Sequence, residues 1–196
     1  MSRTTARFLA GGVAVVLAVT GFSGLAAADT APAAIPTGSA VVIENNTFLQ
    51  SAAGSGVFIV PLPNASVSYD TTKGLSTTLP VTGGSINLRG YYGNATLDGS
   101  LLFVDIQTGK SVLFKQLAFS ADRWRLTGVP DGATAPVSLL RPAGVQESAQ
   151  SGTTQTLAAS NLTLDTTGAQ FLDAQLNTTF FTGGQSVGSF SLTFNG

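Results

Sequence analysis

The segment GYYG, residues 90–93, contains the two side chains of this sequence that are best suited to hold a ligand, Tyr91 and Tyr92. If the segment is a strand, adjacent side chains point to opposite faces. One tyrosine would then enter the core while the other meets a ligand, and a tyrosine oxygen can ligate haem iron. The alternative is that both are ordinary strand aromatics between turn glycines.

Trp124 is the only tryptophan and lies in the alternating segment RWRLTG, residues 123–128. Alternation places Trp124 and Leu126 on the inward face of a strand, with Arg123 and Arg125 outward. A core position for Trp124 is one interpretation. A platform for a sugar ring is the other.

Histidine and cysteine are both absent, which removes several kinds of chemistry. Ser-His-Asp and Cys-His catalysis need one of them, as do zinc sites built on imidazole or thiolate. The carboxylates are few, and pairs such as Asp98-Gly99 and Asp131-Gly132 are typical of turns. We therefore predict a protein that is not an enzyme and has no cofactor and no metal site of its own.

Residues 79–83, LPVTG, match the motif that sortases cut when they anchor proteins to a cell wall. Anchored proteins carry this motif near the C-terminus, before an apolar span, and here a long β-like sequence follows it. We interpret Leu79 and Val81 as strand residues, Pro80 as the mark of an edge strand, and Thr82-Gly83-Gly84 as a turn.

The N-terminus predicts export. Residues 1–28 have a basic start, a long apolar run and a small-residue end, which together are typical of a signal peptide. Residues 29–39 are an Ala/Pro-rich segment that we expect to be a flexible leader, and residues 40–196 form one domain. Cleavage would leave a mild net charge of about −3 and no basic patch. We thus expect a secreted protein with no nucleic-acid partner and no membrane span after cleavage.

The sequence pattern of the domain is typical of β structure over nearly its whole length. QTGK (107–110) predicts a hairpin between two strands, and a phase change near Lys115-Gln116 predicts a bulge in the second of them. The polar stretch 142–155 predicts a long hairpin tip or an exposed loop. Apolar spacings of three and four predict one short helix near 166–177, capped by Asp165 or Thr166. The fold class is therefore all-β, a single antiparallel sandwich or barrel-like domain of about nine or ten strands.

The C-terminal half resembles a group of secreted actinobacterial β-proteins that is related to the HtaA-type domain of haem-uptake proteins. A loose pattern carries this resemblance at Gly168, Ala169, Leu176, Asn177, Thr179, Phe181, Gly184 and Gly188. The resemblance implies a β-sandwich with short helices and a haem held by a tyrosine. The histidine that partners this tyrosine in HtaA-type domains is missing here, and Tyr69, Tyr91 and Tyr92 are the ligand candidates.

Three functions remain open on the sequence. The first is a secreted, non-enzymatic β-domain with a structural or binding role at the cell envelope, where its partner is an unknown protein or glycan. The second is haem or small-molecule binding through Tyr91 or Tyr92. The third is a carbohydrate-binding module that uses Trp124.

Overall fold

The computed structural model describes residues 35–196. The expected signal peptide, residues 1–28, lies outside the described residues, as does most of the expected leader, 29–39. The first strand begins at Thr37, so the last three residues of that leader belong to the β structure. Within residues 35–196 no helix combines the length and apolar character needed to span a bilayer.

The described chain is mostly antiparallel β structure with two short helices, which confirms the all-β prediction. Its elements, in chain order, are β1 (Thr37–Glu44), α1 (Asn46–Gly54), β2 (Val57–Leu62), β3 (Ser66–Asp70), β4 (Gly74–Asn87), β5 (Tyr92–Leu97), β6 (Ser100–Asp105), β7 (Lys110–Ser120), β8 (Arg125–Pro130), β9 (Val137–Ser151), β10 (Thr154–Leu164), α2 (Thr166–Leu176) and β11 (Ser186–Asn195).

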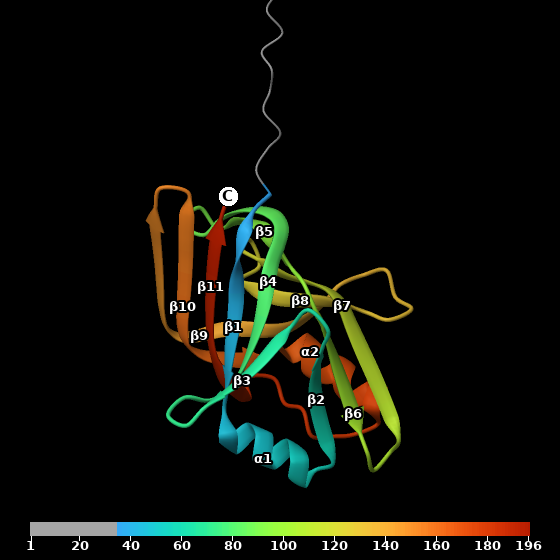
Figure 1. Cartoon of the computed structure of the whole chain (residues 1–196). Coiled ribbons are helices and arrows are strands. Elements are labelled where there is room, and N and C mark those ends of the chain that lie inside the picture. The colour runs from blue at the N-terminus through green and yellow to red at the C-terminus, as the bar shows by residue number, and fades with distance from the viewer. Residues whose placement is uncertain (1–34) are drawn as a thin grey trace, which may run out of the picture. The chain divides into compact units, whose positions relative to one another are not determined.

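Eight of these strands form a closed barrel in the order β7-β5-β4-β1-β11-β10-β9-β8, and β8 pairs back with β7. β6 and β2 extend the sheet beyond β7, and β3 is added at β4. Thr37 pairs with Asn195, so the start of β1 lies beside the end of β11. Figure 1 shows this end of the barrel next to the C-terminus and α1 at the opposite end.

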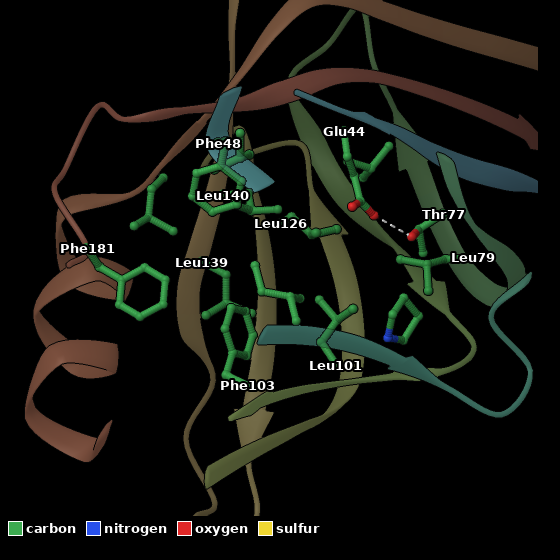
Figure 2. Close-up of a pocket in the computed structure, with 15 residues that line it drawn as sticks. Glu44, Phe48, Thr77, Leu79, Leu101, Phe103, Leu126, Leu139, Leu140 and Phe181 are labelled. Carbon is green, nitrogen blue, oxygen red and sulfur yellow. Dashed lines mark hydrogen bonds between the residues drawn. The ribbon is translucent and has the colours of Figure 1, made fainter. Parts of the chain in front are cut away.

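The wall of the barrel differs between its two ends, because β4 and β7 each change partners along one edge. β4 pairs with β3 through Thr78 and with β5 from Val81 onward. β7 pairs with β6 through Phe114 and with β5 from Ala118 onward. β5 therefore completes the wall at one end, and at the other end the sheet stops at β3 and β2. A cavity lined mostly by apolar side chains lies in this second region (Figure 2).

Alternating apolar residues from the strands fill the interior, and α2 packs against β7 and β9. Phe114, Phe119, Leu126 and Leu139 are almost completely buried there. Asp165 is the N-cap of α2 and accepts a hydrogen bond from the Thr167 amide at 3.0 Å. The predicted helix near 166–177, with Asp165 as one of its two candidate caps, is thus confirmed.

Several local predictions are also confirmed. QTGK joins β6 and β7 in a hairpin, and the β7–β8 register shifts between Lys115 and Ala118, with Gln116 at φ 50°. The polar stretch 142–155 is the distal part of the long β9–β10 hairpin. Asp98-Gly99 connects β5 to β6 through a bend at Gly99, but β5 and β6 do not pair with each other across it. Helix α1, which Asn45 caps through its side chain, was not predicted.

The interpretation of LPVTG is right for its apolar residues and wrong for the rest. Leu79 and Val81 are buried strand residues. Pro80, however, pairs with Ser39 of β1 inside the barrel rather than on an edge strand. Thr82-Gly83-Gly84 is not a turn, because β4 continues through it with a bulge between Val81 and Gly83. Gly84 has φ 98°, a backbone conformation that glycine adopts without steric cost, so the strand bends here without ending.

Gly84→Ala tests this account of the bend. A Cβ at Gly84 would lie 2.2 Å from the carbonyl oxygen of Asn94 on β5. We expect the substitution to lower the free energy of unfolding by about 2 kcal/mol or more, measured by urea denaturation. Gly83→Ala is the matched control, because its nearest neighbours, atoms of Thr96, are 3.8 Å from the added Cβ. Similar losses in both variants would contradict the assignment.

Candidate functional site

The structure places Tyr91 and Tyr92 outside the core. Tyr91 lies in the turn between β4 and β5 at φ 56°, and Tyr92 is the first residue of β5. Their exposed fractions are 64% and 59%. The expectation that one of them would be buried was wrong, because a turn, not a strand, carries Tyr91. Asn87 holds this turn by accepting from the Gly90 amide at 2.6 Å and donating to the Tyr92 hydroxyl at 3.1 Å.

The ring of Tyr91 packs against Trp124, with centroids 5.2 Å apart and planes tilted by 49°. Trp124 precedes β8, has φ 55° and is half-buried. The Trp124 ring also packs edge-on against the Phe119 ring, with centroids 5.6 Å apart. Phe119 in turn stacks on Phe190, with centroids 5.5 Å apart. The aromatic row therefore runs from an exposed tyrosine to the buried core, and each such pair contributes about 0.5–1.5 kcal/mol. Tyr91 and Trp124, which belong to separate segments of the sequence, are therefore in contact.

Tyr91 and Trp124 form one side of an open cleft of about 290 Å³, which we call the Tyr91–Trp124 cleft. Three elements supply its other lining residues, which are Ala121, Asp122, Gln146, Ser148 and Leu157. The hydroxyl of Tyr91 bonds to no other residue of the described chain. The cleft therefore combines exposed aromatic faces with free polar groups, an arrangement typical of ligand sites.

Three polar side chains, those of Asp122, Gln146 and Ser148, lie at the rim of the Tyr91–Trp124 cleft. The Trp124 indole Nε1–H donates to Oε1 of Gln146, and the amide nitrogen of Gln146 donates one of its two N–H groups to the carbonyl oxygen of Pro142 at 3.4 Å. The Ser120 hydroxyl donates to Asp122, and this hydrogen bond holds the pKa of the exposed Asp122 carboxyl below its usual value. Asp122 is therefore ionised at neutral pH. The rim offers a carboxylate, an amide and the Ser148 hydroxyl to a ligand.

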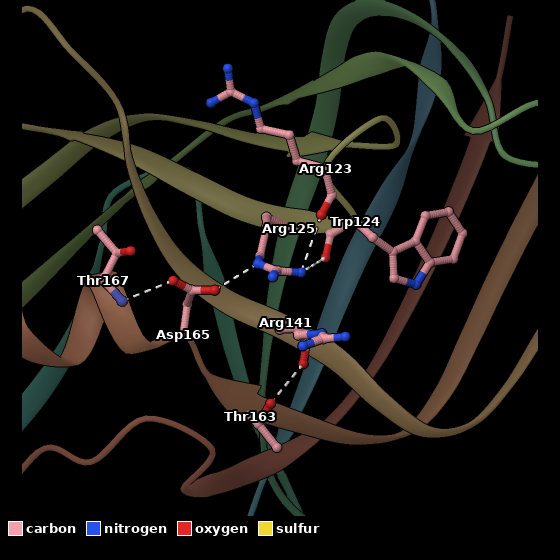
Figure 3. A network of polar contacts seen from close by, with 7 residues as sticks. All are labelled: Arg123, Trp124, Arg125, Arg141, Thr163, Asp165 and Thr167. Atoms are coloured by element: carbon pink, nitrogen blue, oxygen red, sulfur yellow. Dashed lines mark hydrogen bonds and ion pairs between the residues drawn. The ribbon is translucent and has the colours of Figure 1, made fainter.

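Arg125 fixes the turn that carries Trp124 (Figure 3). Its Nε lies 2.6 Å from Oδ2 of Asp165, and its Nη1 donates to the carbonyl oxygens of Arg123 and Trp124, both at 3.1 Å. The expectation that Arg125 points outward is wrong, because its guanidinium turns to Asp165 and is largely shielded from solvent. Since Asp165 also caps α2, one ion pair joins the Trp124 turn to that helix.

No group of three or more Asp and Glu side chains within residues 35–196 is arranged to hold a metal ion. Asp122, the one acid in the lining of the cleft, accepts a hydrogen bond from the Ser120 hydroxyl. The aromatic rings of the cleft can stack on a ligand, and its polar side chains can form hydrogen bonds with it.

Arg125→Met tests the role of the ion pair. It leaves Asp165 without its partner and two carbonyl oxygens without a donor, so we expect the free energy of unfolding to fall by about 2–3 kcal/mol. The emission maximum of Trp124 should shift as well, because its turn loses support. Arg123→Met is the control: its side chain is exposed, and we expect a change within about 0.5 kcal/mol. An unchanged Trp124 spectrum in Arg125→Met would contradict this positioning role.

Comparison with known proteins finds a likeness in fold. The solved structure of the C-terminal domain of HtaA from Corynebacterium glutamicum superposes with a TM-score of 0.51 at 18% sequence identity, covering 82% of this chain and 98% of that domain. No family model matches the sequence. No curated protein matches it either. The resemblance to HtaA-type domains is thus confirmed as a shared architecture.

Proposed function

We propose that this chain is a secreted, non-enzymatic binding domain that acts outside the cell or at the cell envelope, and that it holds a glycan in the Tyr91–Trp124 cleft. The observation that carries the proposal is the exposed Tyr91 ring, fixed against a half-buried Trp124 beside free polar groups. A non-enzymatic role is consistent with the absence of histidine and cysteine.

The chemistry of the cleft matches a sugar ring. The faces of a sugar carry C–H groups, which pack on the electron-rich faces of aromatic rings. Its edges carry hydroxyls, which donate to carboxylates and accept from amides. Tyr91 and Trp124 supply the first kind of contact, and Asp122, Gln146 and Ser148 supply the second. Trp124 is not fully buried, so it remains available as part of the platform.

The Trp124 ring is also held in position before a ligand binds. Trp124 is held on its inner side by Phe119, at its indole nitrogen by Gln146, and at its backbone by Arg125. A ring that is already fixed loses little conformational entropy on binding, which favours affinity.

Tyr91→Ala is the direct test of the glycan site. We expect the wild-type domain, residues 35–196, to be retained on at least one insoluble bacterial or plant polysaccharide, and Tyr91→Ala to lose about tenfold or more in affinity. Tyr69→Ala is the matched control, because Tyr69 is 71% exposed on β3 and does not line the cleft. The proposal fails if no polysaccharide retains the wild type, or if the two variants bind equally.

A second candidate is haem or a related planar molecule, with Tyr91 as the iron ligand. Two observations favour it: the fold shared with HtaA, and a Tyr91 hydroxyl that no described residue occupies, whereas that of Tyr92 accepts from Asn87. A haem titration followed by visible absorption decides the matter. A saturable Soret shift that Tyr91→Phe abolishes and Tyr69→Phe preserves would support haem. A spectrum identical to that of free haem would exclude it.

A further inference from the structure

A second cavity, distinct from the Tyr91–Trp124 cleft, lies inside the barrel at the end where the wall stops at β2 and β3 (Figure 2). Its volume is about 60 Å³. The lining is apolar except for two residues, and comes from strands on all sides, from α1 and from the segment after α2. The residues are Val42, Glu44, Phe48, Ile59, Pro61, Thr77, Leu79, Leu101, Phe103, Leu126, Leu139, Leu140, Leu164, Phe181 and Val187.

Glu44 is the one ionisable side chain in this lining. The Thr77 hydroxyl donates to its Oε1 at 2.8 Å, and Figure 2 shows the pair side by side on one wall. No hydrogen bond within residues 35–196 occupies its other carboxylate oxygen. Glu44 is partly exposed, and its partial burial raises the pKa of the carboxyl more than the Thr77 hydrogen bond lowers it.

A partly buried carboxylate with one unpaired oxygen, among leucines and phenylalanines, is less favourable for the folded protein than one that water fully surrounds. Glutamine would accept the same hydrogen bond from Thr77 without the charge. A costly ionisable group that faces a cavity is a feature of functional sites, where a ligand supplies the missing partner. The lining holds no lysine or arginine, so a cationic ligand is the partner that this carboxylate lacks.

The size of the cavity restricts the shape of the ligand. Its volume of about 60 Å³ is well below the roughly 150 Å³ of an apolar cavity that accepts benzene. The cavity therefore takes only the end of a slim alkyl chain, and the rest of the chain lies at its opening. Val42, Glu44, Ile59 and Pro61 are partly exposed, so they mark the side from which a chain enters.

We infer that this cavity binds the end of an unbranched aliphatic amine, with the alkyl chain among the leucines and the ammonium group paired with the free oxygen of Glu44. This inference is independent of the proposed glycan site. The two linings share no residue. Thr77 and Asn87 lie at the two ends of β4, separated by roughly 30 Å of strand.

The test uses residues 35–196 and three probes of equal chain length, n-octylamine, n-octanol and octanoate, below their micelle concentrations. Isothermal titration calorimetry should show one saturable site for the amine, weaker binding of the alcohol and the weakest binding of the carboxylate. In Glu44→Gln the amine should lose about tenfold or more in affinity, since a charge-assisted hydrogen bond is lost. No binding of the amine, or equal binding by the two proteins, would overturn the inference.

A cavity-blocking variant separates this site from non-specific binding. Ile59→Trp places a large side chain in the lining and should abolish amine binding. Val60→Trp is the matched control, because Val60 is adjacent on β2, 41% exposed and absent from the lining. Equal amine affinity in both variants would count against the site. Polysaccharide retention should be unchanged in both, so failure of the glycan proposal remains a separate result.

The stability of Glu44→Gln tests the premise that the charged Glu44 carboxylate lowers the free energy of unfolding. Because the folded state raises the pKa of Glu44 above 4.5, Glu44 favours folding in acid, and this contribution is lost as the pH rises through its folded-state pKa. Without ligand, Glu44→Gln should therefore melt at a higher temperature than wild type at neutral pH. The gap should narrow as the pH falls toward 4.5. A variant that is less stable at neutral pH would overturn the inference.

Discussion

The arrangement of this protein depends on the kink in β7 at Gln116. Before the kink β7 pairs with β6, and after it with β5, while its other edge pairs with β8 from Phe114 onward and closes the barrel. A straight β7 would keep one partner along the whole edge. The left-handed backbone of Gln116, at φ 50°, therefore gives the barrel one end completed by β5 and one end that stops at β2 and β3. On β4 the pairing with β3 ends at Thr78 and the pairing with β5 begins at Val81, directly before the bulge between Val81 and Gly83.

Each end carries a different kind of surface as a result. At the end completed by β5, the short turns before β5 and β8 bring Tyr91 and Trp124 into contact, and Arg125 ties this region to the cap of α2. At the other end, the interior remains partly open and Glu44 faces an apolar cavity. The first surface is polar and shallow, and suits a hydroxyl-rich ring. The second is narrow and apolar, and suits a chain.

Much of the fold follows from local patterns in the sequence. The hairpin at QTGK, the bulge at Lys115-Gln116 and the helix capped by Asp165 were predicted because turn residues, phase changes and caps act over a few positions. Helix α1 was missed, although Asn45 before Phe48 and Ala52 is a possible capping signal. Thr82-Gly83-Gly84 was misread as a turn because glycine permits both a turn and a strand bulge. Only the pairing of Gly84 with Ala95 on β5 decides between them.

The candidate site was predicted in its residues but not in its geometry. Tyr91 and Trp124 were both singled out, yet 32 positions separate them and no local pattern joins them. Their contact depends on the pairing of β5 with β7, which is a long-range feature. The ion pair of Arg125 with Asp165 was likewise invisible, because strand alternation alone placed Arg125 on the outer face. Glu44 was one acid among ten until the fold surrounded it with apolar side chains.

The central claim is that Trp124 and Tyr91 together form a glycan-binding platform. Because Trp124 is the only tryptophan, its indole N–H gives a single signal in a proton–nitrogen correlation spectrum of the labelled domain. Titration with a soluble oligosaccharide of a retained polysaccharide should shift this signal progressively to saturation, since Nε1 bonds to Gln146 at the rim of the cleft. An indole signal that stays fixed while signals elsewhere in the domain shift would contradict the account.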